Sequence, residues 1–227
     1  MKSIKILNTT TKNPITLIGE RAGICWGSDI SNGEKNYKRG LDCLEHQHGR
    51  TFEFVNVEIV IDGYSARVIR EWYTHIGGAP TRLQASTRYI NYSEFPYVTP
   101  KTISADKEAL KIYNGTMNQI ADSLKQLEEL NIPREDIAML LPLGMTTKIV
   151  DKRNLRSYMD MAQQRMCARA YWEYRELFRD ICDALSKYSQ EWSYVVDRYF
   201  IPKCDKLDYC PEEKSCGRHP TLGGTNV

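Results

Sequence analysis

The sequence predicts an α+β fold, in which an antiparallel sheet packs against long helices within a single domain. The N-terminal half combines an alternating, strand-like pattern with short helical patterns, whereas helical periodicity dominates the C-terminal half. With 227 residues and no change in composition that marks a linker, the chain is long enough to bury one core. We expect a folded domain over residues 1–203 and a Cys-rich tail over residues 204–227.

The clearest strand pattern runs over residues 55–62, where apolar and polar side chains alternate, and Asp62-Gly63 marks a turn after it. Ser65 is a suitable N-cap for a short helix that reaches Trp72. The Gly-Gly-Ala-Pro sequence of residues 77–80 predicts a loop. A second strand is expected over residues 88–92.

Helical spacing governs the second half of the chain. Apolar residues recur three and four apart over residues 105–131, which predicts a long amphipathic helix, and residues 134–141 fit a short one. A second long helix is expected over residues 154–177, with an asparagine cap at its start, and a third over residues 191–200. The chain from residue 203 onward is expected to be polar and irregular.

Composition restricts the class of partner. The 31 Lys and Arg residues against 29 Asp and Glu residues leave a net charge of +2, too small for a protein whose main partner is duplex nucleic acid. There is no run of about 18 apolar residues, so no membrane span is expected. Residues 1–5 lack the apolar stretch of a signal peptide, and an odd number of cysteines is typical of a reducing compartment. We therefore expect a cytoplasmic protein.

The segment of residues 74–89 has the composition of an anion-binding loop. Arg82 and Arg88 can each bind a phosphate through two hydrogen bonds, and Ser86 can donate another. The adjacent glycines allow the backbone to approach a ligand closely. The spacing fits no standard phosphate loop, so a surface loop with solvated charges is the alternative.

Arg165 falls among residues that favour burial, namely Ala162, Met166 and Cys167. A partly buried arginine needs an anionic or carbonyl partner. That partner is either a ligand or an internal carboxylate, and the residues alone leave both open.

Two clusters contain side chains of the metal-ligating types. Cys43, His46 and His48 fit no usual zinc spacing, and we expect an ordinary polar junction there. The tail offers three thiols and an imidazole whose five-residue gaps are longer than usual for zinc, so free thiols are the alternative: Cys204, Cys210, Cys216 and His219. No metal ligand is assigned from the sequence.

Several motifs follow one another in a recognisable order. His48–Glu53 precedes the first strand, His75 follows the short helix, and Ser86 is followed by Arg88-Tyr89. In the second half the motifs are Ile132–Glu135, Leu141–Leu143, Asn154–Ser157, Arg165 and Ala170–Glu173. Over about residues 20–200 the chain resembles the flavin-dependent thymidylate synthase family.

The chain also departs from the pattern of that family. The family signature reads Arg-His-Arg, whereas Thr74 and Ile76 flank His75 here, and nine residues instead of seven separate Ile76 from the serine. Glutamine and glutamate are exchanged at Glu71 and Gln84, and Ala138 stands where many members carry arginine. Arg50 and Arg82 are extra cations nearby that can replace the missing ones.

The resemblance implies reductive methylation of dUMP at C5 to dTMP, with FAD as cofactor and NADPH and methylenetetrahydrofolate as co-substrates. It makes Arg165 the catalytic residue, whose guanidinium stabilises negative charge on the pyrimidine. The implied substrate-binding residues are Glu71, Arg82, Gln84, Ser86, Thr87, Arg88 and Arg165. The implied cofactor-binding residues are Arg50, His75, Asn154, Arg156 and Asp160. A homotetramer with sites between subunits is also implied, with the helix of residues 105–131 partly a subunit contact.

Two alternatives stay open. The same flavin and folate chemistry could act on another pyrimidine monophosphate such as dCMP, because the carboxylate of Glu71 can accept a hydrogen bond from an exocyclic amine. The altered signature is also compatible with a homologue that binds a nucleotide or a partner protein without turnover.

Overall fold

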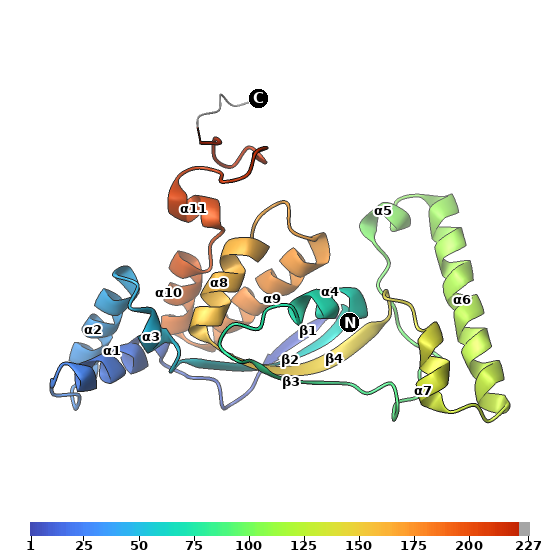
Figure 1. Ribbon diagram of the computed structural model, residues 1–227, viewed down its shortest axis with the longest axis horizontal. Helices are drawn as coiled ribbons and strands as arrows, with labels where there is room; N and C mark the ends of the chain where they lie inside the picture. Colours follow the sequence, from blue (N-terminus) through green and yellow to red (C-terminus); the bar gives the residue numbers. More distant parts are fainter. Residues whose placement is uncertain (223–227) are drawn as a thin grey trace.

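A computed structural model of the chain describes residues 1–222 (Figure 1). Its centre is an antiparallel four-stranded sheet in the order β1-β2-β4-β3. The strands are β1 (Ser3–Ile6), β2 (Asn56–Ser65), β3 (Thr81–Gln84) and β4 (Thr146–Asn154). Helices lie against this sheet and beyond both of its ends (Figure 1), so the predicted α+β class is confirmed.

The alternating strand prediction is confirmed over residues 56–62, but the strand continues to Ser65, so the turn predicted at Asp62-Gly63 is a register shift within β2 instead. Val57, Ile59 and Ile61 of β2 are fully buried, whereas the residues between them face the other side of the sheet. Ser65 ends the strand and caps α4 (Ala66–Trp72), because its side chain accepts a hydrogen bond from the Val68 backbone at 3.2 Å. Strand and cap together fix where α4 leaves the sheet.

One face of the sheet carries the main core. It is covered by α4, α8 (Leu155–Arg165), α9 (Trp172–Tyr188) and α10 (Gln190–Tyr199), as Figure 1 shows. Fully buried aromatic side chains fill the space between them, among them Trp72, Tyr158, Tyr174, Phe178 and Trp192. The predicted helix over residues 191–200 is confirmed by α10.

Two further groups of helices lie at opposite ends of the sheet (Figure 1). At one end are α1 (Pro14–Cys25), α2 (Gly33–Glu45) and α3 (Gly49–Phe52). At the other are α5 (Lys101–Ser104), α6 (Lys107–Glu129), α7 (Arg134–Ile137) and the 3-10 turn η1 (Ala138–Leu140). The latter enclose a second, smaller core around Phe95, Met117, Leu124, Ile137 and Met145. The predicted helices over residues 105–131 and 134–141 are confirmed.

The predicted helix over residues 154–177 is wrong as a single element. The chain leaves helical geometry after Arg165 and resumes it at Trp172, so α8 and α9 are separate. The break lets α9 approach the sheet, where buried Glu173 accepts a hydrogen bond from the Ser65 backbone at 2.8 Å. No proline or glycine lies between the two helices, so local sequence did not reveal the break.

The predicted strand over residues 88–92 is also wrong. Residues 86–90 form a turn, in which the Ile90 backbone donates to the Ser86 carbonyl at 3.1 Å. The strand is β3, which begins at Thr81 because it pairs there with Lys152 of β4. The tail is not wholly irregular either, since α11 (Lys203–Leu207) begins it. Residues 223–227 of the predicted tail lie outside the described residues.

The helices α1 and α2, which the sequence did not predict, cross at a glycine contact. A Cβ atom at Gly40 would overlap the carbonyl oxygen of Ile15, and one at Gly19 would overlap that of Asn36. Glycine is therefore required at both positions for the two backbones to approach this closely. No helix in residues 1–222 is both long and apolar enough to cross a membrane.

We expect Gly40→Ala to destabilise the protein by about 1–3 kcal/mol, because the overlap with backbone exceeds the gain in helix propensity of about 1 kcal/mol. Gly33→Ala is the matched control, since a Cβ atom there meets nothing within 4 Å. Denaturant unfolding of both variants measures the difference. Equal stabilities would show that the two helices can separate without loss.

Candidate active site

Arg165 ends α8, and its guanidinium is held by side chains from α4 and the loop after it. Its Nε atom donates to Nε2 of His75 at 2.9 Å, and its Nη1 atom lies 3.4 Å from Oε2 of Glu71. The guanidinium also stacks 4.5 Å from the ring centre of Tyr174. Its side chain is 21% exposed, and Nη2 has no hydrogen-bond partner among residues 1–222. The structure thus presents an oriented cation with one edge left for a ligand.

A buried ion pair supports this cluster from behind. Arg153 and Asp151 have fully buried side chains and form two hydrogen bonds of 2.7 Å each. Asp151 also accepts a hydrogen bond from the Trp72 indole at 2.9 Å, and Arg153 lies 4.5 Å from the centre of that ring. The Arg153 Nη1 atom reaches the His75 carbonyl oxygen at 3.4 Å. The pair therefore fixes the end of α4 and the backbone that carries His75.

His75 is held in its neutral form. Burial lowers the pKa of His75 to about 4, and the charges of Arg165 and Arg153 act in the same direction. Because Nε2 accepts from Arg165, the proton of the neutral ring belongs on Nδ1. A neutral imidazole orients the guanidinium of Arg165 without repelling it.

This geometry predicts a pH dependence of stability. The pKa of His75 is lower in the folded state than the ordinary value of 6.5, so the unfolded chain binds the proton more tightly. The contribution of His75 is fully present above pH 6.5 and is lost progressively as the pH falls towards 4. We expect His75→Gln to flatten the decline of Tm between these pH values. Thermal melts of both proteins across the window measure it, and parallel curves would contradict the prediction.

The loop after His75 docks on the start of α8. Asn154 caps this helix by accepting from the Ser157 backbone at 2.9 Å, and the Ser157 hydroxyl donates to the Gly77 carbonyl oxygen. Gly78 has φ +76°, and a Cβ atom there would lie 2.6 Å from Nδ2 of Asn154. The predicted loop over residues 77–80 is confirmed, and glycine permits its close approach to Asn154.

Two residues predicted to bind the cofactor, Arg50 and Arg156, lie together near the start of α8. Arg156 and Arg50 both pair with Glu53, at 2.8 Å and 3.1 Å respectively. The hydrogen bond from Arg156 is the largest cause that lowers the pKa of Glu53, and the charge of Arg50 adds to it. Asp160 follows on the next turn of α8, where burial raises its pKa against the charges of Arg156 and Lys206. The side chains of Arg50 and Arg156 are 86% and 51% exposed, so both can reach a ligand.

Strand β3 contributes two of the predicted substrate-binding residues. Arg82 folds back on the chain, because it donates to the Tyr73 carbonyl oxygen at 2.9 Å and stacks 4.4 Å from the centre of the Tyr73 ring. Gln84 is exposed and donates to the Thr147 hydroxyl at 3.3 Å. Within residues 1–222, neither side chain is paired with a carboxylate.

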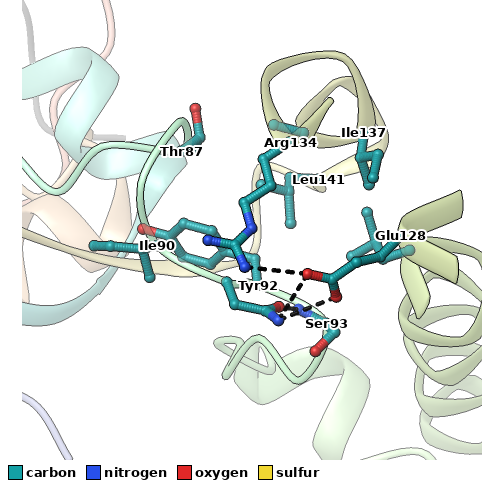
Figure 2. A pocket seen from close by; sticks show the side chains of 11 residues that line it. Thr87, Ile90, Tyr92, Ser93, Glu128, Arg134, Ile137 and Leu141 are labelled. Atoms are coloured by element: carbon teal, nitrogen blue, oxygen red, sulfur yellow. Dashed lines mark hydrogen bonds and ion pairs between the residues drawn. The ribbon is translucent and has the colours of Figure 1, made fainter. Parts of the chain in front are cut away.

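Ser86, Thr87 and Arg88 lie in a different part of the chain's fold. Arg88 pairs with Glu135 of α7 at 2.9 Å, so the loop after β3 is directed towards α6 and α7. Thr87 lines a cavity of about 30 Å³ that also borders Ala138 and Arg134 (Figure 2). This space holds a water molecule or two, not a nucleotide. Arg165 and the predicted phosphate loop therefore belong to separate parts of the chain.

The sequence pattern of the family described as thymidylate synthase complementing protein matches residues 5–189. The chain belongs to this family. A flavin-dependent thymidylate synthase of Nitratidesulfovibrio vulgaris is 27% identical, over 86% of this chain and 82% of that protein. One from Clostridium tetani is 24% identical, over 95% of this chain and 93% of that protein.

The fold agrees with that of a solved relative of this family. A crystal structure described as thymidylate synthase X from Helicobacter pylori with FAD and dUMP superposes with a TM-score of 0.66. It is 17% identical and covers 87% of this chain and 100% of that one. Both the resemblance to flavin-dependent thymidylate synthases and the predicted fold class are confirmed.

Several residues around the candidate site were not predicted from the sequence. Tyr174 packs on Arg165, while Asp151 and Arg153 support His75 from the core. Arg134 borders the cavity beside Ala138 and pairs with Glu128 at 3.2 Å, so it offers a cation where the usual arginine is absent. The alternation of Asp151 and Arg153 within a strand was the signal for the buried pair, but β4 itself was not predicted.

Proposed function

We propose that this protein is a flavin-dependent thymidylate synthase that methylates dUMP at C5 to dTMP, with methylenetetrahydrofolate as carbon donor and NADPH as reductant. The observation that supports this proposal most directly is the orientation of the Arg165 guanidinium by neutral His75 and by Tyr174, in a chain of this family. The relatives named as flavin-dependent thymidylate synthases support the reaction, and the Helicobacter pylori structure with FAD and dUMP supports the ligands.

Several side chains near the start of α8 and beside His75 are suited to binding FAD. Exposed Arg50 and Arg156 match a pyrophosphate in charge and hydrogen-bond geometry, and Ile76, which is 70% exposed beside His75, can cover an apolar ring face. When bound and reduced, FAD supplies the hydride that completes the methyl group. Asn154 and Asp160 border the same region through α8. These residues bind and orient, and none of them acts as a covalent nucleophile.

Arg165 would act on the pyrimidine. Its Nη2 edge can donate to a ring carbonyl, and a fixed cation there stabilises negative charge as it develops on the ring. The partial stacking on Tyr174 and the bond to His75 limit how far the guanidinium can move. Because it is already oriented before the substrate binds, little reorganisation is needed during the reaction.

A second candidate substrate, dCMP, is favoured by one observation. Glu71 lies 3.4 Å from Nη1 of Arg165, so its carboxylate is next to the guanidinium edge that would meet the base. A carboxylate accepts from the exocyclic amine of cytosine but not from the carbonyl of uracil. An anaerobic assay with FAD, NADPH, methylenetetrahydrofolate and either dUMP or dCMP, with the product identified by mass, decides between the two. No methylated product from either would remove the proposed function.

We also propose a homotetramer in which each site combines Arg165 of one protomer with Ser86–Arg88 of another. The separation of the two half-sites within one protomer supports this arrangement. Apolar side chains beside the second half-site are exposed, namely Leu83, Tyr89, Ile90, Met139, Leu140 and Leu143. Such a surface is typical of a subunit contact.

A cytoplasmic location is supported by the seven cysteines, all in the described range and all free.

Mixed oligomers test the shared site. We expect Arg165→Ala and Arg88→Ala each to be nearly inactive alone, and their co-expressed mixture to recover roughly a quarter of wild-type activity, because some sites receive both intact halves. Light scattering should give the mass of four chains. A monomer, or a mixture no more active than either variant, would contradict the arrangement.

A further inference from the structure

The C-terminal tail brings a set of metal-ligating side chains to one place. Ligand atoms of Cys204, Asp205 and His219 all lie within 4.8 Å of one another. The Cys204 sulfur is 3.8 Å from Oδ1 of Asp205, and the His219 Nε2 atom is 2.9 Å from the same oxygen. Ligands of a tetrahedral zinc ion are about 3.3–3.8 Å apart, so a small rotation of the imidazole makes the set suitable for zinc.

More thiols border the same region. A cavity of about 510 Å³ between the tail and the end of α8 is lined by Cys167, Cys204, Cys210 and Cys216. Cys167 comes from the break between α8 and α9, whereas the other three come from the tail. Four of the seven cysteines of the chain therefore line one cavity, although Cys167 lies far from the other three in sequence.

The tail has little else to hold it in a defined shape. Among residues 203–222, only Cys204 and Cys210 are buried. Its ordering contacts are polar: Arg218 with Asp205 at 2.9 Å, Arg169 with Glu212 at 3.0 Å, and the Cys210 backbone with the Pro220 carbonyl oxygen at 2.7 Å. Exposed ion pairs contribute little, and small segments without a core depend on a disulfide or a metal.

We propose that the tail binds a structural zinc ion through Cys204, Asp205 and His219, with the fourth ligand a thiolate of Cys167, Cys210 or Cys216. Thiolate and imidazole ligands favour zinc over magnesium or calcium, and zinc has no redox chemistry of its own. The pairing of Arg218 with Asp205 leaves one carboxylate oxygen for the metal.

The zinc site would attach the tail to the catalytic end of α8. Arg165 and Gln164 line the same cavity as the four cysteines, and α11 packs against α8 (Figure 1). Binding would therefore fix the tail beside the exposed edge of the catalytic guanidinium. The site needs neither flavin nor nucleotide, so its existence can be tested separately from the proposed function.

The test is the zinc content of the full-length protein, prepared under reducing conditions without a histidine tag, loaded with Zn²⁺ and desalted. We expect about one zinc per chain by elemental mass spectrometry. Cys204→Ser and His219→Ala should fall to background, while Cys25→Ser, which removes an exposed cysteine outside the tail, should keep its zinc. Circular dichroism should show that all variants keep the fold.

The absorption spectrum of the Co²⁺-loaded protein is a second, independent measurement. Co²⁺ in place of Zn²⁺ should produce a thiolate-to-metal charge-transfer band that Cys204→Ser weakens. The proposal is overturned by wild-type protein that retains no more zinc than the two ligand variants. It is also overturned if each of the single Cys→Ser changes at positions 167, 210 and 216 leaves the zinc content intact. A disulfide within the tail of the protein that was reduced and loaded with zinc would overturn it too.

Discussion

Arg165→Ala is expected to lower kcat for dTMP formation by about 10²–10³-fold, the effect of removing one preorganised donor from a developing negative charge. The fold should survive, because the side chain is 21% exposed and its partners Glu71 and His75 lie at the surface of the main core. The effect should fall mainly on kcat, since the guanidinium acts on charge that appears during the reaction.

The conservative variant separates charge from geometry. Arg165→Lys keeps the cation but cannot donate to His75 and a ligand in one plane, so we expect it to recover only a small part of the activity. Arg179→Ala is the matched control, because this exposed arginine of α9 donates, within the described part of the chain, only to the Arg175 carbonyl oxygen, at 3.2 Å. Steady-state kinetics and Tm are measured for all three. Activity of Arg165→Ala within a few-fold of wild type would refute the catalytic role.

Asp151→Ala is expected to destabilise the protein by about 3–5 kcal/mol, because it leaves the buried guanidinium of Arg153 without its carboxylate. Both side chains have no solvent exposure, and the Trp72 indole loses its acceptor in the same variant. For a chain of this size, such a loss lowers Tm by about 10 °C. The position of His75 should also change, since the Arg153 Nη1 atom bonds its carbonyl oxygen.

A double substitution shows where the loss comes from. Asp151→Leu combined with Arg153→Met removes both charges at similar volume, and we expect it to recover more than half of the stability. Asp62→Ala breaks the 2.7 Å pair with Lys148 on the surface and should change stability by less than about 1 kcal/mol. Denaturant unfolding compares the set. If the double variant were less stable than Asp151→Ala, the unpaired charge would not be the cause.

The residues of the candidate site were largely available from the sequence, because motifs keep their order along the chain. His75, Asn154 and Arg165 were found from their neighbours; in the structure Asn154 caps the start of α8, whereas Arg165 ends it and bonds His75. The contact of Arg165 with Tyr174 was not available in this way. Tyr174 reaches it only because the helix breaks after Arg165, and nothing in the local sequence marks that break.

Elements with an uninterrupted pattern were determined by the sequence alone. Strand β2 alternates between buried and less buried residues over 56–61, and helix α6 is amphipathic, so their periodicity reports which face is buried. Strand β4 is different, since Asp151 and Arg153 occupy positions on its buried face and neutralise each other there. Because these two positions are charged, β4 lacks the alternation of apolar and polar residues by which a strand is predicted from sequence.

The remaining features were decided by tertiary structure. The α1–α2 crossing depends on backbone contact at Gly40, and β3 begins where β4 offers pairing partners rather than where its own residues favour a strand. Periodicity reports only whether a residue faces a core. Which distant backbone or charge meets it there depends on how the chain folds back on itself, and that is why the sequence determined the site's residues but the fold determined their geometry.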